Sequence, residues 1–474
     1  MLEVLNPATG EVVEKLQPAT EEDADDAVAR AKGAFPKWRA VEPADRARLL
    51  RRLADALDTE RENLAQLEAK NTGKPIGDSR GEMEMVAETF HYYAGMPERL
   101  LGESIPVSGG VDVTFREPLG VVGLIVPWNF PLTIASWKMA PALAAGNTLV
   151  LKPAGLTPLT AVEFERIARD AGIPEGVVNV VVGPGSKVGQ RLVEHPDVAK
   201  VAFTGSTEVG KKIAEGAAGT IKRVTLELGG KSANVVFADA DLEKAAASAP
   251  VAVFGNAGQD CCARSRILVE RSVFDDFLSL MQPAVEDFKV GDPFDEATDM
   301  GPLISADHRE NVASYVSEDA PVAIKGSAPE GSGFWYPPTV LAPLSNDDRA
   351  AREEIFGPVV AVIPFEDEED AIRQANDTIY GLSGSIWTQN GARALRVARR
   401  IETGVLSINS NTSVRVATPF GGMKQSGVGR ELGPHALDYY AEVKNVYIST
   451  ESEEHSSEPW AQGADDADLS AEEG

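Results

Sequence analysis

The chain has 474 residues, of which 43% are hydrophobic and 25% are charged. This length and composition indicate a globular protein of two or three domains and exclude general disorder, since a domain takes roughly 100–200 residues. The 73 acidic and 45 basic residues give a formal net charge of −28, which disfavours binding to nucleic-acid phosphates or to anionic membranes.

The first hundred residues are predicted to be helical. Residues 1–10 contain neither the basic nor the apolar stretch of a secretory signal peptide, so we expect a cytoplasmic protein. Apolar residues recur at helical spacing over 21–35 and 44–70. Residues 104–117 alternate around a Gly-Gly pair, which predicts a β-hairpin.

From residue 121, short apolar runs alternate with helix-length segments. Near-continuous apolar strands separated by helices are typical of a buried parallel sheet. Two such series are predicted, one before and one after about residue 230. The strands of the first are 121–126, 148–151, 177–182, 200–203 and 224–228, with helices at 160–171, 186–194 and 206–218. The strands of the second are 232–237, 266–269, 359–364, 383–387 and 404–409.

Residues 119–137 carry no charge and approach the length that spans a bilayer. Pro127 and Pro131 interrupt this stretch, so a buried strand, a turn and a new helix fit better than a membrane helix. A last strand, 444–449, is left without a series, and we expect it to pair with the lone hairpin or with another subunit.

The C-terminal residues 451–474 contain nine acidic residues and no Lys or Arg, which predicts a disordered tail. The rest of the chain is also strongly acidic. This composition favours a halophilic protein that stays soluble in concentrated salt, where self-repulsion is screened. An ordinary acidic cytosolic protein is the alternative.

Two adjacent cysteines, Cys261 and Cys262, lie in a loop of small residues before a predicted strand. They offer no disulfide framework, and no histidine has metal-ligand spacing, so we expect no metal site. A thiol presented at a sheet edge is a candidate nucleophile, and positive charge from Arg264 or Arg266 would favour its thiolate. A buried structural cysteine is the alternative.

Three other segments carry candidate chemistry. Glu227 ends an apolar strand, where ligands bind to parallel sheets, and could serve as a general base. Gly205 joins a strand to a helix, so the amides at Ser206 could face a phosphate, although the three-glycine dinucleotide pattern is absent. Asn129 lies in a very apolar stretch and could donate a hydrogen bond to a ligand oxygen. Each segment taken alone also fits a purely structural role.

Together these segments resemble the aldehyde dehydrogenase superfamily, over residues 3 to about 450. The matching motifs are Pro127-Trp-Asn-Phe-Pro131, Leu-Lys152-Pro-Ala, Phe-Thr-Gly-Ser206, Glu227-Leu-Gly-Gly-Lys, Gly-Gln-Asp-Cys261, Glu353-Glu-Ile-Phe-Gly-Pro358 and Pro419-Phe-Gly-Gly-Met-Lys-Gln-Ser-Gly427. The resemblance implies an α/β fold and a homodimer or homotetramer. It implies a variant Rossmann domain for NAD(P) (1–97 and 119–229), an α/β catalytic domain (230–443) and a small β oligomerisation element (98–118 and 444–450).

The resemblance also implies oxidation of a small-molecule aldehyde to the acid. Cys261 would attack the aldehyde, while Asn129 and the Cys261 amide would bind the oxyanion. Glu227 would activate the water that hydrolyses the thioester, because members that transfer the acyl group to coenzyme A generally lack this base. Lys138 and Glu442 match positions linked to proton relay in some members.

A dinucleotide site, for NAD or NADP, follows from the same resemblance. Lys152 would hold the adenosine ribose, Ser206 the pyrophosphate and Glu354 the nicotinamide ribose. Strictly NAD-preferring members often carry a glutamate where this chain has Gly155, so use of NADP stays open. The residues matched to the cofactor site are Pro127, Trp128, Lys152, Gly155, Gly205, Ser206, Val209, Leu228, Glu354 and Phe356.

The substrate is the least defined feature. Its candidate lining residues are Trp137, Asp260, Ser410, Asn411 and Arg415. Arg415 could pair with the distal carboxylate of a semialdehyde, or it could be a solvated arginine. Oxidation of betaine aldehyde or another small aliphatic aldehyde is an alternative, as are a catalytically silent structural homologue and a phosphate-dependent dehydrogenase on a related fold.

Overall fold

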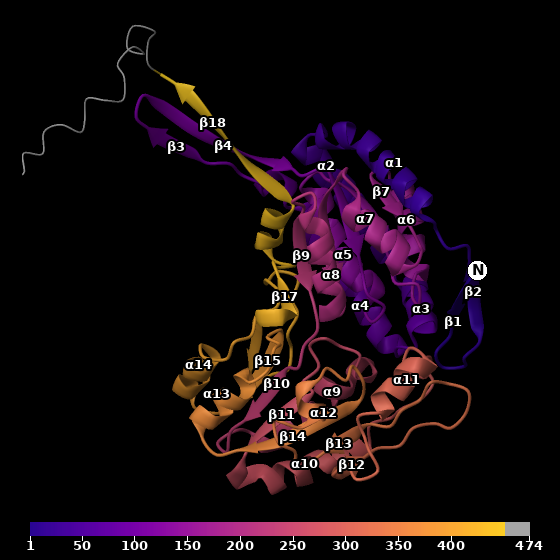
Figure 1. Cartoon of the computed structure of the whole chain (residues 1–474), viewed down its shortest axis with the longest axis vertical. Coiled ribbons are helices and arrows are strands. Elements are labelled where there is room, and N and C mark those ends of the chain that lie inside the picture. Colours follow the sequence, from indigo (N-terminus) through magenta and orange to yellow (C-terminus); the bar gives the residue numbers. More distant parts are fainter. Residues whose placement is uncertain (451–474) are drawn as a thin grey trace, which may run out of the picture.

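The structure is a computed structural model that describes residues 1–450, so the predicted acidic tail 451–474 lies outside the described residues. Two α/β halves, each built on a largely parallel sheet, lie one above the other, and a β arm projects from the upper half (Figure 1). The predicted α/β fold class is therefore confirmed.

The first sheet has the strand order β17-β9-β8-β5-β6-β7. Its parallel strands follow the predicted first series: β5 (Val121–Ile125), β6 (Thr148–Lys152), β7 (Val178–Val180), β8 (Val198–Thr204) and β9 (Arg223–Glu227). The antiparallel edge strand β17 (Gly427–Val428) comes from far along the chain and pairs with β9. That pairing brings the C-terminal segment against Glu227.

Helices cover both faces of this sheet, because its strands are apolar on both sides. One face packs against α2 (Pro43–Thr59), α3 (Arg61–Thr72), α4 (Ile76–Ala94), α5 (Pro131–Ala144) and α6 (Leu159–Asp170). The other face packs against α1 (Glu21–Arg39), α7 (Gln190–Glu194) and α8 (Thr207–Ala218).

The second sheet has the order β12-β13-β14-β11-β10-β15-β16. Its parallel strands are β10 (Ala233–Val236), β11 (Arg266–Glu270), β13 (Thr339–Leu341), β14 (Val359–Phe365), β15 (Ser383–Trp387) and β16 (Val405–Ile408), with β12 (Val322–Lys325) antiparallel at one edge. The helices of this half are α9 (Leu242–Phe254), α10 (Phe274–Glu286), α11 (Ala306–Ala313), α12 (Arg349–Arg352), α13 (Glu368–Asn376) and α14 (Gly391–Ala398).

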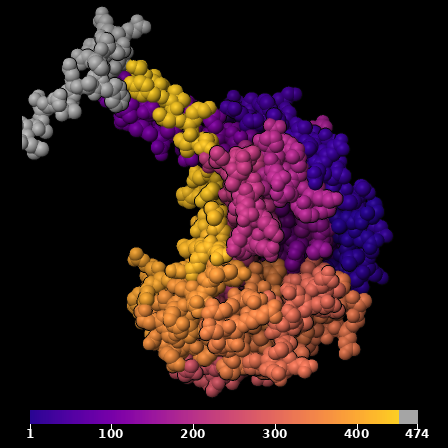
Figure 2. Space-filling model, in the orientation of Figure 1, coloured from indigo at the N-terminus to yellow at the C-terminus, as the bar shows by residue number. Residues whose placement is uncertain are grey.

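The arm consists of β3 (Ser104–Val107), β4 (Gly110–Pro118) and β18 (Ala441–Ser449). Strand β18 runs antiparallel to β4 along its whole length, from Ala441 opposite Pro118 to Ser449 opposite Gly110. The prediction that the hairpin and the C-terminal strand find each other is confirmed. The arm stands away from the body of the molecule (Figure 2).

Two predictions for the N-terminal region are wrong in detail. The first hundred residues also contain a hairpin, β1 (Leu2–Leu5) and β2 (Val12–Leu16), because Asn6 closes a tight turn with its side chain. The helix predicted over 44–70 is two helices, since Glu60 leaves helical geometry at φ −88 and ψ 3.

The uncharged stretch 119–137 forms strand β5, a turn and the beginning of α5, as predicted. Every residue of α5 is buried. Among residues 1–450, none of the helices combines the length and the apolar character that crossing a membrane requires.

Candidate active site

A cavity of about 880 Å³ is lined by residues of both halves of the molecule. Cys261, Cys262 and Asp260 reach it from the second half, and Glu227 reaches it from the end of β9. Much of the remaining wall is apolar or aromatic, including Phe130, Trp137, Ile134, Val251, Val414 and Phe420. A mainly apolar cavity with a few converging polar groups is typical of a small-molecule site.

The loop that carries the cysteines is held in an unusual conformation. Asn256 and Ala257 are left-handed, with φ 52 and 54, and Gln259 Oε1 accepts a hydrogen bond from the Ile304 amide at 2.9 Å. Such left-handed residues are strained and persist only where the surroundings hold them. Both thiols line the cavity, but Cys261 is half-buried whereas Cys262 is buried.

Asn129 lies beside this loop. Its Nδ2 donates to the Gln259 carbonyl at 2.9 Å, and its own carbonyl oxygen accepts from Lys74 Nζ at 2.8 Å. Among residues 1–450, the bond to Gln259 is the one hydrogen bond that Asn129 Nδ2 donates, so its second N–H is free. The backbone N–H of Cys261 also has no acceptor among these residues. The Asn129 amide, bound to the loop that carries Cys261, and the Cys261 amide therefore each keep a free N–H, and free N–H donors are what an oxyanion site requires.

Glu227 is almost fully buried, and neither of its carboxyl oxygens has a partner among the described residues. Burial raises the pKa of Glu227 well above its ordinary value, and the nearby Glu431 adds to this, while Lys138 opposes it. A Cβ at Gly421 would lie 2.6 Å from Glu227 Oε1, so glycine leaves room for the carboxyl. A buried carboxyl with a raised pKa is suited to acid–base chemistry.

Lys138 lies on α5 with its ammonium group fully buried and ion-paired with Glu431. Glu442, which the sequence analysis placed with Lys138, instead lies on the arm strand β18, where it is exposed and ion-paired with Arg223. The structure therefore places Glu431 and not Glu442 beside Lys138. The reason is that the chain leaves the body of the molecule at residue 441, so position 442 faces outward.

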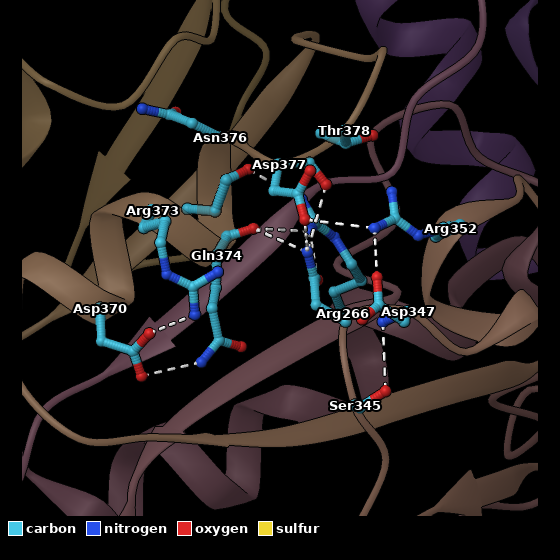
Figure 3. Close-up of polar contacts among 12 residues, drawn as sticks. Arg266, Ser345, Asp347, Arg352, Asp370, Arg373, Gln374, Asn376, Asp377 and Thr378 are labelled. Carbon is cyan, nitrogen blue, oxygen red and sulfur yellow. Dashed lines mark hydrogen bonds and ion pairs between the residues drawn. The ribbon is translucent and has the colours of Figure 1, made fainter.

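The two arginines near the cysteines point in different directions. Arg264 is fully buried at the cavity wall, and it donates to Ser385 Oγ at 3.1 Å and to Ser383 Oγ at 2.9 Å. Arg266 turns away and donates to the Gln374 carbonyl at 3.0 Å within a separate polar cluster (Figure 3). Only Arg264 is thus positioned to influence the thiols.

The carboxyl ends of β6 and β8 carry groups that suit a phosphate or a ribose. Lys152 ends β6 with its Nζ unpartnered among the described residues, and burial lowers its pKa to about 8. Ser206 is the N-cap of α8, and its Oγ accepts from the Val209 amide at 3.4 Å. An amine and a helix N-terminus at the same sheet edge can bind an anionic group.

A second group of residues connects this edge with the cysteine loop. Glu354 Oε1 accepts from the Gly230 amide at 2.9 Å, and burial raises the pKa of Glu354 to about 7. Phe356 is left-handed at φ 57, its carbonyl contacts His308 Nε2 at 2.7 Å, and its ring lies 5.3 Å from that of Trp128. Glu354 is thus bound to Gly230, and Gly230 lies against the Cys261 backbone, where a Cβ would be 2.2 Å from the Cys261 carbonyl oxygen.

The other cofactor candidates occupy mixed environments. Val209 is 41% exposed at the start of α8, and Leu228 is buried just after β9. A Cβ at Gly155 would meet only the Leu2 side chain, at 3.6 Å, so the position is open. Pro127 is half-buried directly after β5, and Gly205 donates its N–H to the Glu227 carbonyl at 3.0 Å.

Four of the five substrate candidates line the cavity, namely Trp137, Asp260, Ser410 and Asn411. Arg415 is not among the lining residues that the structure describes. Sequence reasoning missed Phe130, Phe420 and Glu431. Glu431 stands four residues after the last matched motif, and its pairing with Lys138 across 293 positions has no signal in the sequence.

The α/β fold and a mainly apolar cavity that holds two thiols and a buried carboxyl are consistent with an oxidoreductase, and similar proteins identify the family. A profile of the aldehyde dehydrogenase family matches residues 1–446. The chain is 44% identical over 459 residues to betaine aldehyde dehydrogenase of Bacillus subtilis (94% of each chain), and 42% identical over 452 residues to an aldehyde dehydrogenase of Aspergillus niger (94% of this chain, 91% of the relative). A crystal structure of Staphylococcus aureus betaine aldehyde dehydrogenase in complex with NAD+ superposes with a TM-score of 0.92 at 39% identity, covering 95% of this chain and 92% of the other.

The chain belongs to the aldehyde dehydrogenase family. It is an enzyme that oxidises an aldehyde to a carboxylic acid with reduction of NAD(P)+.

Proposed function

We propose that Cys261 is the nucleophile of this oxidation. The observation that carries the proposal is that Cys261 lines the cavity and that its own amide and the Asn129 amide, which is bound to the same loop, each keep a free N–H. Attack by sulfur on the aldehyde carbon places negative charge on oxygen, where these donors meet it. One donor of this kind contributes roughly 2.7–4 kcal/mol to the stability of the transition state.

Glu227 has the role of general base in the second half of the reaction. A nicotinamide bound here would supply the hydride acceptor, so that loss of hydride would leave the acyl group on Cys261 as a thioester. Glu227 then takes a proton from water, which attacks the thioester and releases the acid. Its buried carboxyl, with Lys138 and Glu431 behind it, has an environment in which a proton can be held and passed on.

We propose that the dinucleotide binds at the carboxyl ends of the first sheet. Lys152 has an unpartnered Nζ for the adenosine ribose, and the α8 N-terminus at Ser206 suits the pyrophosphate. Glu354 and Phe356 would hold the nicotinamide end near Cys261. The open position at Gly155 leaves space for a 2′-phosphate, so we propose that both NAD and NADP are accepted.

For the substrate, the lining favours an uncharged or cationic aldehyde over one that ends in a carboxylate. Arg415 does not line the cavity, and the N–H groups of Arg264 already have acceptors. The wall includes the carboxyls of Asp78 and Glu82, of which Glu82 is paired with Lys74, together with Lys244 and aromatic rings. One relative is named for betaine aldehyde, which is a small cationic substrate, and we place this class ahead of semialdehydes.

The experiment that tests the function is a panel of aldehydes assayed by absorbance of the reduced cofactor. The panel contains betaine aldehyde, a neutral aliphatic aldehyde and succinate semialdehyde, each with NAD and with NADP. Higher kcat/KM for the first two is the expected result. A clear preference for the semialdehyde would reject the assignment of substrate class.

We propose three structural units, one for each of the two large sheets and one for the β arm. The nucleotide half comprises 1–97 and 119–229, the catalytic half 230–443, and the arm 98–118 and 444–450. The arm exposes Val443, Val446, Tyr447 and Ile448 on its edge strand β18. Exposed apolar edges of this kind are covered in native proteins, so we propose a homodimer or homotetramer built on the arm. We also propose a cytoplasmic, halophilic enzyme, from the acidic composition.

A further inference from the structure

Asp260 directly precedes Cys261, and its carboxyl faces the same region as the thiols. A carboxylate oxygen of Asp260 and the Sγ atoms of Cys261 and Cys262 all lie within 4.8 Å of one another. The Cys262 amide donates to Asp260 Oδ1 at 2.8 Å, which fixes the carboxyl group. Among residues 1–450, Oδ2 has no N–H donor, so this oxygen is free to accept a proton from sulfur.

The surroundings make Asp260 a stronger base than a surface aspartate. Burial raises its pKa above the ordinary value, so its carboxylate holds a proton more readily. The buried cations Arg264 and Lys74 oppose this rise. Lys74 is itself ion-paired with Glu82 at 2.5 Å. The Asp260 carboxyl can therefore be ionised before the reaction and can accept the proton of a thiol during it.

The thiol needs such an acceptor. The neighbouring Cys262 and burial together raise the pKa of Cys261 well above its ordinary value. A thiol of this kind is a poor nucleophile until its proton is removed. Asp260 is a carboxyl that acts electrostatically on Cys261, whereas Glu227 interacts with Glu431, Lys138, Arg430 and Cys262.

We propose that Asp260 is the general base that takes the proton of Cys261 during attack on the aldehyde. The S–H bond breaks as the S–C bond forms, the proton moves to a carboxylate oxygen of Asp260, and the C=O electron pair moves to oxygen. When the thioester is hydrolysed, the departing sulfur takes the proton back from Asp260. The cycle returns thiol and carboxylate, and Glu227 keeps the separate task of activating water.

This proposal rests on the assignment of Cys261 as the nucleophile, and it differs from a role of Asp260 in substrate binding alone. A lining carboxylate would change the KM for the aldehyde. A general base changes the rate at which the thiohemiacetal forms. Asp78 lines the same cavity from α4 and is therefore a matched carboxyl for comparison.

The first experiment measures the burst of reduced cofactor in Asp260→Asn at saturating aldehyde. Loss of a general base costs about 10²–10⁴-fold, so we expect the burst rate constant to fall by about 100-fold at pH 7. Attack then becomes slower than hydride transfer, so the isotope effect of the aldehyde deuterated at C1 should disappear. Asp78→Asn should change the KM and keep the isotope effect. A D260N burst with wild-type rate and isotope effect would overturn the proposal.

The second experiment measures how fast iodoacetamide labels Cys261 in the free enzyme from pH 5 to 10, with the label located by mass spectrometry. The titratable or charged groups facing this pair are Lys74, Arg264, Cys262 and Glu354. All of them remain in D260N, which loses only a negative charge that raises the pKa of Cys261. Labelling should therefore move to lower pH. At a pH below the labelling midpoint of both enzymes, where Cys261 is still a thiol, the D260N burst should nevertheless be slower, because no base takes the proton. If the labelling rate and the burst rate constant fell together, Asp260 would only hold the conformation of the cysteine loop, and the proposal would be wrong. The wild-type enzyme is assayed alongside. If it oxidises the aldehyde, a negative result for D260N bears on Asp260 alone and not on the proposed function.

Discussion

The side-chain amide of Asn129 donates to the Gln259 carbonyl at 2.9 Å, two residues before Cys261. This hydrogen bond fixes the amide relative to the loop that carries the nucleophile, so the second Nδ2 hydrogen has a defined direction. Asn129→Ala removes that donor. We expect kcat to fall by about 10²–10³-fold, which corresponds to roughly 2.7–4 kcal/mol, with folding checked by the thermal unfolding midpoint. A kcat within a few-fold of the wild type would show that Asn129 does not bind the oxyanion.

Glu227→Gln should separate the two halves of the reaction. The amide cannot deprotonate water, so the thioester on Cys261 should accumulate. We expect a burst of about one reduced cofactor per active site followed by turnover slowed by about 10²–10⁴-fold, measured by stopped flow. Mass spectrometry of the acylated enzyme is the direct check. Equal slowing of the burst and of the steady state would place Glu227 in the first half instead.

The acid side of the pH–rate profile should report Glu227. Its pKa is raised by burial and by the negative charge of Glu431, and it acts as a base only when ionised. Deacylation should therefore fall as the pH drops below a midpoint well above that of an ordinary glutamate. Glu431→Gln removes the like charge, so the midpoint should move to lower pH. The unpaired Lys138 cation would act in the same direction, so an unchanged or higher midpoint would show that this ionisation does not belong to Glu227.

Gly155→Glu tests the cofactor site. A side chain added at this position meets only Leu2, so the variant should fold. The added carboxylate would repel a 2′-phosphate, and we expect kcat/KM with NADP to fall at least about tenfold relative to NAD, about 1.4 kcal/mol. The ratio of the two constants is the measurement. An unchanged ratio would place the adenosine ribose elsewhere.

The strands that carry the site could be predicted from the sequence because they are apolar on both faces. The runs that became β5 and β8 stand out for that reason, whereas β9 alternates polar and apolar residues. The carboxyl ends of these strands are where Asn129, Ser206 and Glu227 were expected. The paired hairpin and C-terminal strand followed from the same logic, since neither had another partner.

Contacts between distant segments could not be predicted. Glu431 reaches Lys138 because β17 joins the edge of the first sheet, and two-residue strands leave no periodicity in a sequence. The direction of a side chain is equally hidden, as Arg264 and Arg266 show. Both precede or begin the same strand, yet only Arg264 faces the cavity.

The most direct test of the account compares Cys261→Ala with Cys262→Ala in a burst assay at saturating aldehyde and cofactor. The two thiols are neighbours, but only Cys261 is half-exposed at the cavity. We expect Cys261→Ala to abolish both the burst and the turnover and Cys262→Ala to retain the burst. Turnover that survives in Cys261→Ala, or a burst that is lost only with Cys262, would contradict the assignment of Cys261 as the nucleophile.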